Sequence, residues 1–346
     1  MTVHELQKNG SIKEVHKVTG GPYGGIRVNQ QFESLLEDLF GEQNVGSYRH
    51  EYRSDWLTLK NDFEAKKRGE RILESELKTN IRLPRSFVSM ASKNQTKAMY
   101  SYGSSNVKLK NGEYLALSSG MMKNLFESTV NHIKDHLKTL LQQPELSKVN
   151  ILLLVGGFAD SPLLQREIKS AFSESCKILV PNRASEVVVK GAVLFGKNPG
   201  RITERVVTTT YGADCVRDFI HGVHPEEKKF IADDVEKCNN LFNLFVRENA
   251  TVRLGQKITS TYTPLRANDT EIHINFYSTT NPDSQFVTDP GMKKLGSVMV
   301  VSPDTWRGKN REIEVSMEFG WTEITATARD VSSGNVTQTK IDFLHK

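Results

Sequence analysis

The feature that most constrains the fold is a run of five apolar residues that ends on two glycines and leads into an amphipathic segment. It reads NILLLVGGFADSPLLQREI and covers residues 150–168. Such a run predicts a strand that is apolar on both faces, as in the middle of a helix-covered sheet. Asp160 or Ser161 is expected to cap the helix that follows. The sequence therefore predicts a strand-to-helix unit of an α/β fold, with Gly156 and Gly157 at its turn.

Apolar spacing predicts further helices and hairpins in the first two hundred residues. Apolar side chains recur every three or four residues in three segments, which is the period of an amphipathic helix. These segments are residues 32–40, 54–68 and 119–141. Asn-Gly dipeptides at residues 9–10 and 111–112 lie between alternating runs. They predict two β-hairpins, because Asn and Gly tolerate the positive φ angles of tight turns.

After Gly200 the pattern changes to apolar and polar residues that alternate with period two, as in EIHINFYS and REIEVSMEFG. Turn signals such as NPDS and SSGN separate these runs. The pattern predicts antiparallel β-structure, most simply an all-β sandwich. We therefore expect two domains, one over residues 1–200 and one over residues 201–346.

Composition places the chain among ordinary soluble proteins, with 37% hydrophobic and 25% charged residues among 346. No apolar run is long enough to predict a membrane helix, and the first residues lack the layout of a signal peptide. Cys176, Cys215 and Cys238 form no C-x-x-C pair, as is typical of reduced thiols. These features predict a cytoplasmic protein.

Two classes of site find no support in the sequence. The net charge of +5 is spread along the chain, and a nucleic-acid-binding protein would need a basic stripe. His132 and His136 lie four residues apart on a predicted helix, but no third metal ligand accompanies them. We therefore predict no nucleic-acid partner and assign no metal ligand and no catalytic residue.

Glycine pairs are the first candidates for ligand binding. Glycine lets the backbone approach a ligand and present N–H groups to it, which suits phosphates. The pairs are Gly20-Gly21, Gly24-Gly25 and Gly156-Gly157. Taken singly, each pair is more typical of a turn. The sequence contains neither G-x-x-x-x-G-K-[ST] nor G-x-G-x-x-G, so neither a P-loop nor a dinucleotide fingerprint supports them.

The segment FEAKKR is the second candidate. Glu64, Lys67 and Arg68 stand three and four residues apart, hence on one helix face. One carboxylate and two cations there could hold the ring nitrogens and ribose hydroxyls of a nucleoside. The spacing alone is more typical of a solvated ion-pair face.

The order of these motifs is more informative than any one of them. TGGPYGG before a helix, FEAKKR, a long helix, LLLVGGFADSPLLQ and NRASEVVVKGAVLFG follow one another in the chain. This order resembles the C-terminal half of an actin-like ATPase domain. It is similar to the heat shock 70 kDa proteins, most closely to their divergent twelve-type branch, whose style YTPLR and FVTDPGMKKLG also match. The resemblance implies a partial α/β actin-like ATPase domain followed by a β-sandwich that resembles a substrate-binding domain.

The resemblance also implies a cofactor, ATP or ADP with Mg²⁺. Gly24 and Gly25 match the glycines that approach the nucleotide phosphates. Glu64, Lys67 and Arg68 match the family's adenosine-contacting helix.

Gly156 and Gly157 match the turn beneath the adenine ring, where they leave room for the purine and its ribose. Phe158 and Asp160 depart from the mainstream family, which has a Ser and an Arg there. The contact with the purine is therefore expected to be altered.

Other parts of the family pattern are missing from this sequence. It contains no D-x-G-T-type phosphate loop, no recognisable hydrophobic interdomain linker and no helical lid. Phosphoryl transfer needs Mg²⁺ and groups that position water and stabilise developing charge. We therefore expect weakened nucleotide binding and no efficient ATP hydrolysis by this chain alone. We also expect the chain to be an incomplete version of a longer protein, with Met1 an internal methionine.

The resulting hypothesis is a heat-shock-type, chaperone-like protein whose binding of a polypeptide client or partner protein is linked to nucleotide. That linkage is the activity of the parent family. In this chain, which lacks the phosphate loops, partner binding is expected to reside after about Gly200 and to be insensitive to ATP. Two alternatives stay open. One is an ATP-independent interaction module in which the glycines are only turns. The other is an incomplete metabolite kinase of the same superfamily, against which the β-sandwich argues.

Overall fold

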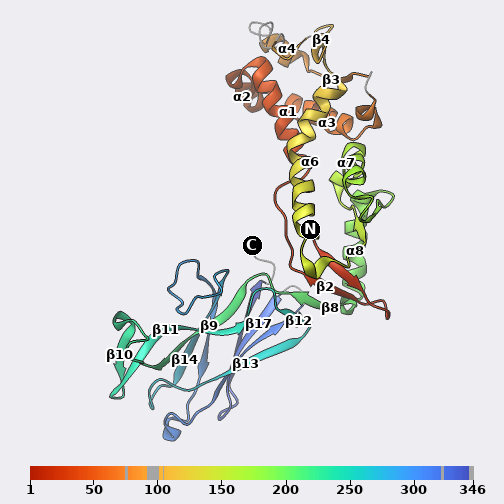
Figure 1. Ribbon diagram of the computed structural model, residues 1–346. Coiled ribbons are helices and arrows are strands. Elements are labelled where there is room, and N and C mark those ends of the chain that lie inside the picture. Colours follow the sequence, from red (N-terminus) through yellow and green to blue (C-terminus); the bar gives the residue numbers. More distant parts are fainter. Residues whose placement is uncertain (75–76, 92–100, 104, 321–322, 343–346) are drawn as a thin grey trace. The chain divides into compact units, whose positions relative to one another are not determined.

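The chain is a mixed α/β protein with several sheets. The computed structural model describes residues 1–74, 77–91, 101–103, 105–320 and 323–342 (Figure 1). Contacts within the chain divide it into two compact units, Gly20–Gly196 and Met1–Thr19 together with Lys197–Lys346. The assignment of residues 1–200 and 201–346 to two domains rests on the change of sequence pattern after Gly200 and stays a prediction.

The unit Gly20–Gly196 is mainly helical (Figure 1). Its helices are α1 Gly25–Phe40, α2 Glu42–Glu51, α3 Arg53–Lys67, α4 Arg85–Ala91, α6 Ser119–Leu141, α7 Pro162–Phe172 and α8 Ala184–Lys197, which ends at the unit's boundary. Its strands are β3 Thr79–Arg82, β4 Val107–Lys110, β5 Tyr114–Leu117, β6 Ile151–Leu153 and β7 Lys177–Leu179. The strands form an antiparallel sheet in the order β3-β5-β4 and a parallel pair β6-β7. The three predicted helices and the hairpin at Asn111-Gly112 are confirmed.

The core of this unit lies between the apolar faces of α1, α3, α6 and α7. Phe32 of α1 and Phe63 of α3 are almost fully buried, and their rings stack with centroids 4.0 Å apart and planes 8° apart. Aromatic pairs add to stability beyond the area they bury. The stack holds the C-terminal part of α3 against α1. Phe63 directly precedes Glu64 in the sequence.

The predicted strand at residues 151–155 is shorter and more exposed than expected. Strand β6 ends at Leu153 and pairs with β7 alone among the described residues. Ile151 and Leu153 are 49% and 55% exposed. The prediction of a strand covered on both faces is therefore wrong for this structure, because an apolar run does not specify which neighbours lie beside it.

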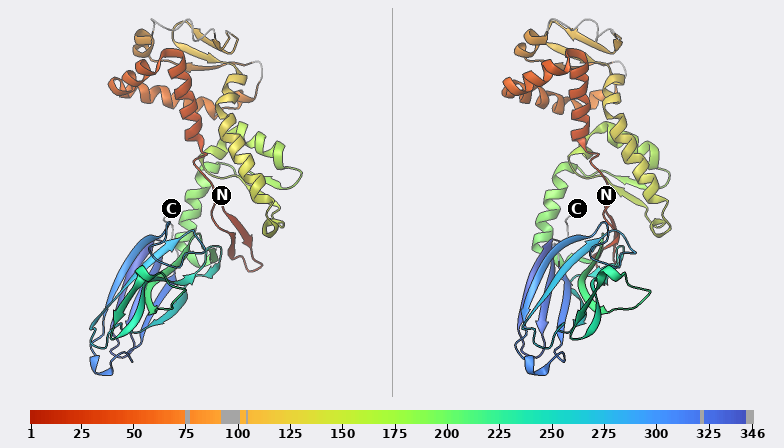
Figure 2. Two further views of the ribbon diagram at one scale, coloured as in Figure 1. Left: turned by 60° about the vertical axis from the view of Figure 1, so that its left-hand side comes forward. Right: turned by 90° about the vertical axis from the view of Figure 1, so that its left-hand side faces the viewer.

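The unit of Met1–Thr19 and Lys197–Lys346 is built from antiparallel sheets with one parallel pairing (Figure 2). One sheet contains β1 Val3–Leu6, β2 Ile12–His16, β8 Ile202–Val206 and β12 Thr251–Arg253. A five-stranded sheet contains, in order, β10 Lys229–Ala232, β11 Val235–Val246, β9 Thr210–Asp218, β14 Glu271–Thr279 and β15 Lys293–Val301. A four-stranded sheet contains β13 Gln256–Tyr262, β16 Ile313–Phe319, β17 Glu323–Asp330 and β18 Val336–Asp342. The predicted hairpin at Asn9-Gly10 is confirmed as β1-β2.

The five-stranded and four-stranded sheets share one hydrophobic cluster. Phe276 and Val300 enter it from the first sheet, and Val315 and Ala326 from the second. Burial alternates along these strands with period two, so the predicted strand pattern after Gly200 is confirmed.

Candidate functional site

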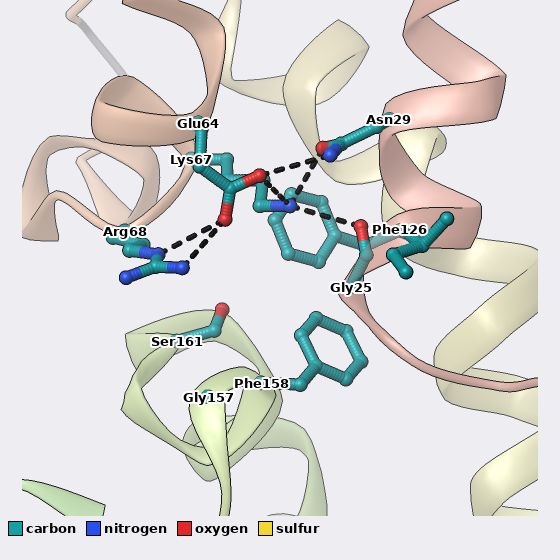
Figure 3. Close-up of a pocket in the computed structure, with 10 residues that line it drawn as sticks. Gly25, Asn29, Glu64, Lys67, Arg68, Phe126, Gly157, Phe158 and Ser161 are labelled. Carbon is teal, nitrogen blue, oxygen red and sulfur yellow. Dashed lines mark hydrogen bonds and ion pairs between the residues drawn. The ribbon is translucent and has the colours of Figure 1, made fainter. Parts of the chain in front are cut away.

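A cavity of about 190 Å³ lies within the unit Gly20–Gly196, where α1, α3, α6 and the segment before α7 approach one another (Figure 3). Its lining residues are Gly25, Ile26, Asn29, Glu64, Lys67, Arg68, Phe126, Gly157, Phe158 and Ser161. They come from four stretches of sequence that are far apart in the chain. The fold therefore places the glycine loop, FEAKKR and VGGF at one cavity.

Most of the predicted site residues line this cavity. Gly25, Glu64, Lys67, Arg68 and Gly157 do so. The other two predicted residues do not belong to its lining; they are Gly24 and Gly156.

The charged residues of α3 form a tight cluster with Asn29 of α1 (Figure 3). One oxygen of Glu64, Oε2, lies 2.6 Å from Lys67 Nζ and accepts a hydrogen bond of 2.9 Å from Asn29 Nδ2. The other, Oε1, accepts two bonds from Arg68, from Nε at 3.1 Å and from Nη2 at 2.7 Å. Lys67 Nζ also donates to Asn29 Oδ1 at 2.6 Å. The cluster joins the N-terminal part of α1 to the last turn of α3.

The two cations of the cluster differ in their exposure to solvent. The side chain of Lys67 is 5% exposed and that of Arg68 is 49% exposed. Burial lowers the pKa of Lys67, and Glu64 offsets this only in part. Burial works to raise the pKa of Glu64, but hydrogen bonds from Lys67, Asn29 and Arg68 outweigh it and lower the pKa. Glu64 is thus held ionised inside the cluster, and FEAKKR is not a fully solvated ion-pair face.

Comparisons of the sequence with known proteins identify its relatives. No family model matches the sequence. Heat shock 70 kDa protein 12A of Homo sapiens and that of Mus musculus are each 36% identical to the chain over 353 residues. These matches cover 100% of the chain. The chain belongs to the twelve-type heat shock 70 kDa protein family. Heat shock 70 kDa protein 12B of Homo sapiens is 36% identical over 358 residues, which cover 99% of the chain. The chain spans about half the length of these curated relatives, 52% in each case.

In this family member, Gly25 makes close packing at the cavity possible. A Cβ atom at this position would lie 3.3 Å from Lys67 Nζ and 3.3 Å from a ring carbon of Phe158. The carbonyl of Gly25 accepts a hydrogen bond of 2.9 Å from Lys67 Nζ. The missing side chain therefore serves the approach of Lys67 and Phe158 to the start of α1. The role of Gly24 and Gly25 towards phosphates stays a prediction.

The loop that precedes α1 is held by an aromatic contact. Tyr23, in TGGPYGG, stacks on His132 of α6 with ring centroids 4.8 Å apart and planes 14° apart. One member of the histidine pair is thus used in packing. Within the described part of the chain, no three His, Cys, Asp or Glu side chains are grouped so that they could hold a metal ion. The described helices also include none that is long and apolar enough to cross a membrane.

The two glycines of the pair Gly156-Gly157 differ in backbone conformation. Gly156 has φ 89° and ψ 170°, a region that is open almost only to glycine. Gly157 does not have a positive φ, and a Cβ atom there would meet nothing within 4 Å. Gly156 makes the turn, and Gly157 leaves open space at the cavity wall.

This difference predicts that substitution by Ala has a large effect on stability at Gly156 and almost none at Gly157. Gly156→Ala should destabilise the unit Gly20–Gly196 by about 1–3 kcal/mol, since Ala is strained at this φ and ψ. Gly157→Ala should change stability by less than about 0.5 kcal/mol, as is usual where nothing is displaced. Urea denaturation of the two variants measures the difference. Equal losses would contradict the proposed division of roles.

Five residues of the cavity were not predicted as site residues: Ile26, Asn29, Phe126, Phe158 and Ser161. Ser161 was predicted only as a helix cap, and its hydroxyl oxygen does accept from Leu164 N at 3.5 Å. Asn29 stands beside the apolar stripe of α1, and only the position of Lys67 reveals its role. A polar residue next to a buried stripe is the single sequence signal that could have indicated it.

Proposed function

We propose that this chain is a heat-shock-type protein that binds a nucleotide in the unit Gly20–Gly196 and a polypeptide or partner protein in its β-rich unit. The observation that supports it is the convergence of Glu64, Lys67 and Arg68 with Gly25 and Gly157 on one cavity. The residues to which the resemblance assigns contacts with adenosine and with the purine line one cavity, and this supports the proposal.

The residues of the cavity fit the nucleoside part of such a ligand. Phe126 and Phe158 provide apolar walls, and their ring centroids are 6.1 Å apart. Arg68 provides a half-exposed cation. Ligand pockets are typically lined by apolar side chains with a small number of polar groups that orient the ligand. At about 190 Å³ the cavity is smaller than usual pockets, which hold about 300–1,000 Å³. It is therefore suited to a ring-sized group and not to a whole nucleoside triphosphate.

Hydrolysis is a separate matter, and we propose that it is impaired in this chain. When bound, Mg²⁺ would bridge the phosphates and neutralise charge that develops on them. Magnesium sites of this kind use one or two carboxylates together with the phosphates themselves. The side chains at this cavity bind and orient a nucleoside, and Lys67 is already fixed by three protein contacts. We assign no catalytic residue.

The β-rich unit is proposed as the partner-binding part. Its two larger sheets share one core, as the sheets of a sandwich do. We propose that these sheets form a sandwich of the substrate-binding type and that its affinity for a partner does not respond to ATP.

One observation favours a second candidate function. Glu64, Lys67 and Asn29 already satisfy one another without a ligand. The cluster could thus be a structural joint, and the chain an interaction module that needs no nucleotide.

Calorimetric titration of the full chain with Mg-ADP and Mg-ATP separates the two candidates. For a nucleotide site we expect micromolar binding that Glu64→Ala weakens at least about tenfold. The carboxylate holds Lys67 and Arg68 in place beside the cavity through charge-assisted hydrogen bonds, which contribute about 1.5–3 kcal/mol each. Lys66→Met is the matched control, since Lys66 is exposed on the same helix and does not line the cavity. If the folded wild-type chain binds neither nucleotide, the nucleotide function is rejected and the interaction module is retained.

A further inference from the structure

A stacked pair of rings attaches the glycine-rich loop before α1 to another helix. The loop is TGGPYGG, residues 19–25, and its last residue, Gly25, lines the cavity. The ring of Tyr23 in this loop stacks on that of His132 of α6, with centroids 4.8 Å apart and planes 14° apart. Tyr23 and His132 are far apart in the sequence, so their contact fixes the loop to a distant part of the unit Gly20–Gly196.

The protein also holds each of the two rings in place. Nδ1 of His132 donates a hydrogen bond of 2.6 Å to the carbonyl of Ser128, one turn earlier on α6. The ring of Tyr23 folds back over Gly21, where a Cβ atom would lie 2.5 Å from a ring carbon. The backbone N–H of Tyr23 donates to the carbonyl of Gly21 at 2.8 Å. Gly21 therefore permits the tight bend in which the ring of Tyr23 reaches α6.

The composition of the loop explains why it needs such an attachment. Four of its seven residues are glycines, and glycine loses more conformational freedom on ordering than any other residue. A loop that is already ordered in the free protein loses less freedom when a ligand binds, and it therefore binds more tightly. The stack of Tyr23 on His132 supplies that order directly before Gly24 and Gly25.

We infer that Tyr23 and His132 are positioning residues for nucleotide binding, whose stack fixes Gly24 and Gly25 where these meet the phosphates. The inference rests on the proposed nucleotide function and on the predicted role of the two glycines. Among the described residues that line the cavity, neither ring is present, so the rings act through the loop and not by contact with the base. Loss of the stack should therefore weaken a ligand that carries phosphates and spare one that carries none.

Calorimetry of the full chain with Mg-ADP and with adenosine tests this inference. Tyr23→Ala and His132→Ala should each weaken Mg-ADP about threefold to tenfold, the range that a stacked pair of rings supplies, and leave adenosine unchanged. Tyr23→Phe keeps the ring and should bind Mg-ADP like the wild-type chain. The double variant should bind no more weakly than either single variant, because both lose the same contact. Asn131→Ala, exposed beside His132 on α6, is the matched control and should change neither constant.

The outcomes separate the inference from the function on which it rests. Equal weakening of adenosine and Mg-ADP overturns the inference, because the rings would then support the cavity as a whole. Unchanged Mg-ADP affinity in Tyr23→Ala, or additive losses in the double variant, overturns it and leaves the nucleotide function intact. The cycle with Mg-ADP alone is decisive if adenosine binds too weakly to be measured. If the folded wild-type chain does not bind Mg-ADP, the proposed function fails and the inference fails with it.

Discussion

Arg311→Met should destabilise the β-rich unit by about 3–5 kcal/mol. Arg311 is fully buried and donates to four backbone carbonyls, those of Gly308, Asp269, Ser302 and Ala267. Removal of the guanidinium leaves these acceptors without a donor, and each buried unsatisfied group costs about 1–3 kcal/mol before relaxation. Such a loss is a large part of the stability of an ordinary domain, about 5–15 kcal/mol.

Hydrogen exchange of peptides from β16 and β17 measures the effect within the unit concerned. Arg307→Met is the matched control, because Arg307 is exposed in the same loop and its guanidinium stacks over Trp306 at 4.6 Å. It should change stability by less than about 0.5 kcal/mol. If both variants lost the same protection, burial of Arg311 would not be the cause.

Periodicity predicted the parts of the fold whose own side chains carry the pattern. Helices α1, α3 and α6 each bury a continuous stripe, and their predicted ranges agree with the structure to within a few residues, apart from the first seven residues of α1. Helix α2 was missed because it buries only Val45 and Tyr48, too few to form a stripe. The prediction that β6 is covered on both faces was wrong for a different reason. A run of apolar residues shows that a strand can be covered, but the neighbours that cover it belong to other parts of the chain.

The site could be predicted only in part for the same physical reason. Helical spacing placed Glu64, Lys67 and Arg68 on one face, but it could not show that Lys67 is buried. That depends on Asn29 and Gly25, which come from another helix. The resemblance connected the segments, and the structure added the partner atoms. The contacts of both Glu64 oxygens with Lys67, Asn29 and Arg68 exist only in the assembled cluster, and spacing in the sequence does not reveal them all.

Phe63→Ala should destabilise the unit Gly20–Gly196 by about 3–5 kcal/mol, the usual cost of removing a buried aromatic ring. The variant leaves a cavity opposite Phe32 and removes the stack that holds the end of α3 against α1. Leu57→Ala is the matched control on the same helix, because Leu57 is 58% exposed. Chemical denaturation should show a loss of less than about 0.5 kcal/mol for this control. A similar loss in both variants would contradict the role assigned to the stack.

The Phe63→Ala variant also tests nucleotide binding. Phe63 and the cavity residue Glu64 are neighbours in the same unit, and a nucleotide that binds only the folded unit stabilises it. At a concentration 100 times its dissociation constant, a ligand adds about 2.7 kcal/mol to the folded state. Mg-ADP should therefore restore much of the protection that Phe63→Ala loses in α3 and little of that which Arg311→Met loses in β16, provided that the two units open independently. Equal restoration in both units would mean that they open as one, and none in either would contradict nucleotide binding at this cavity.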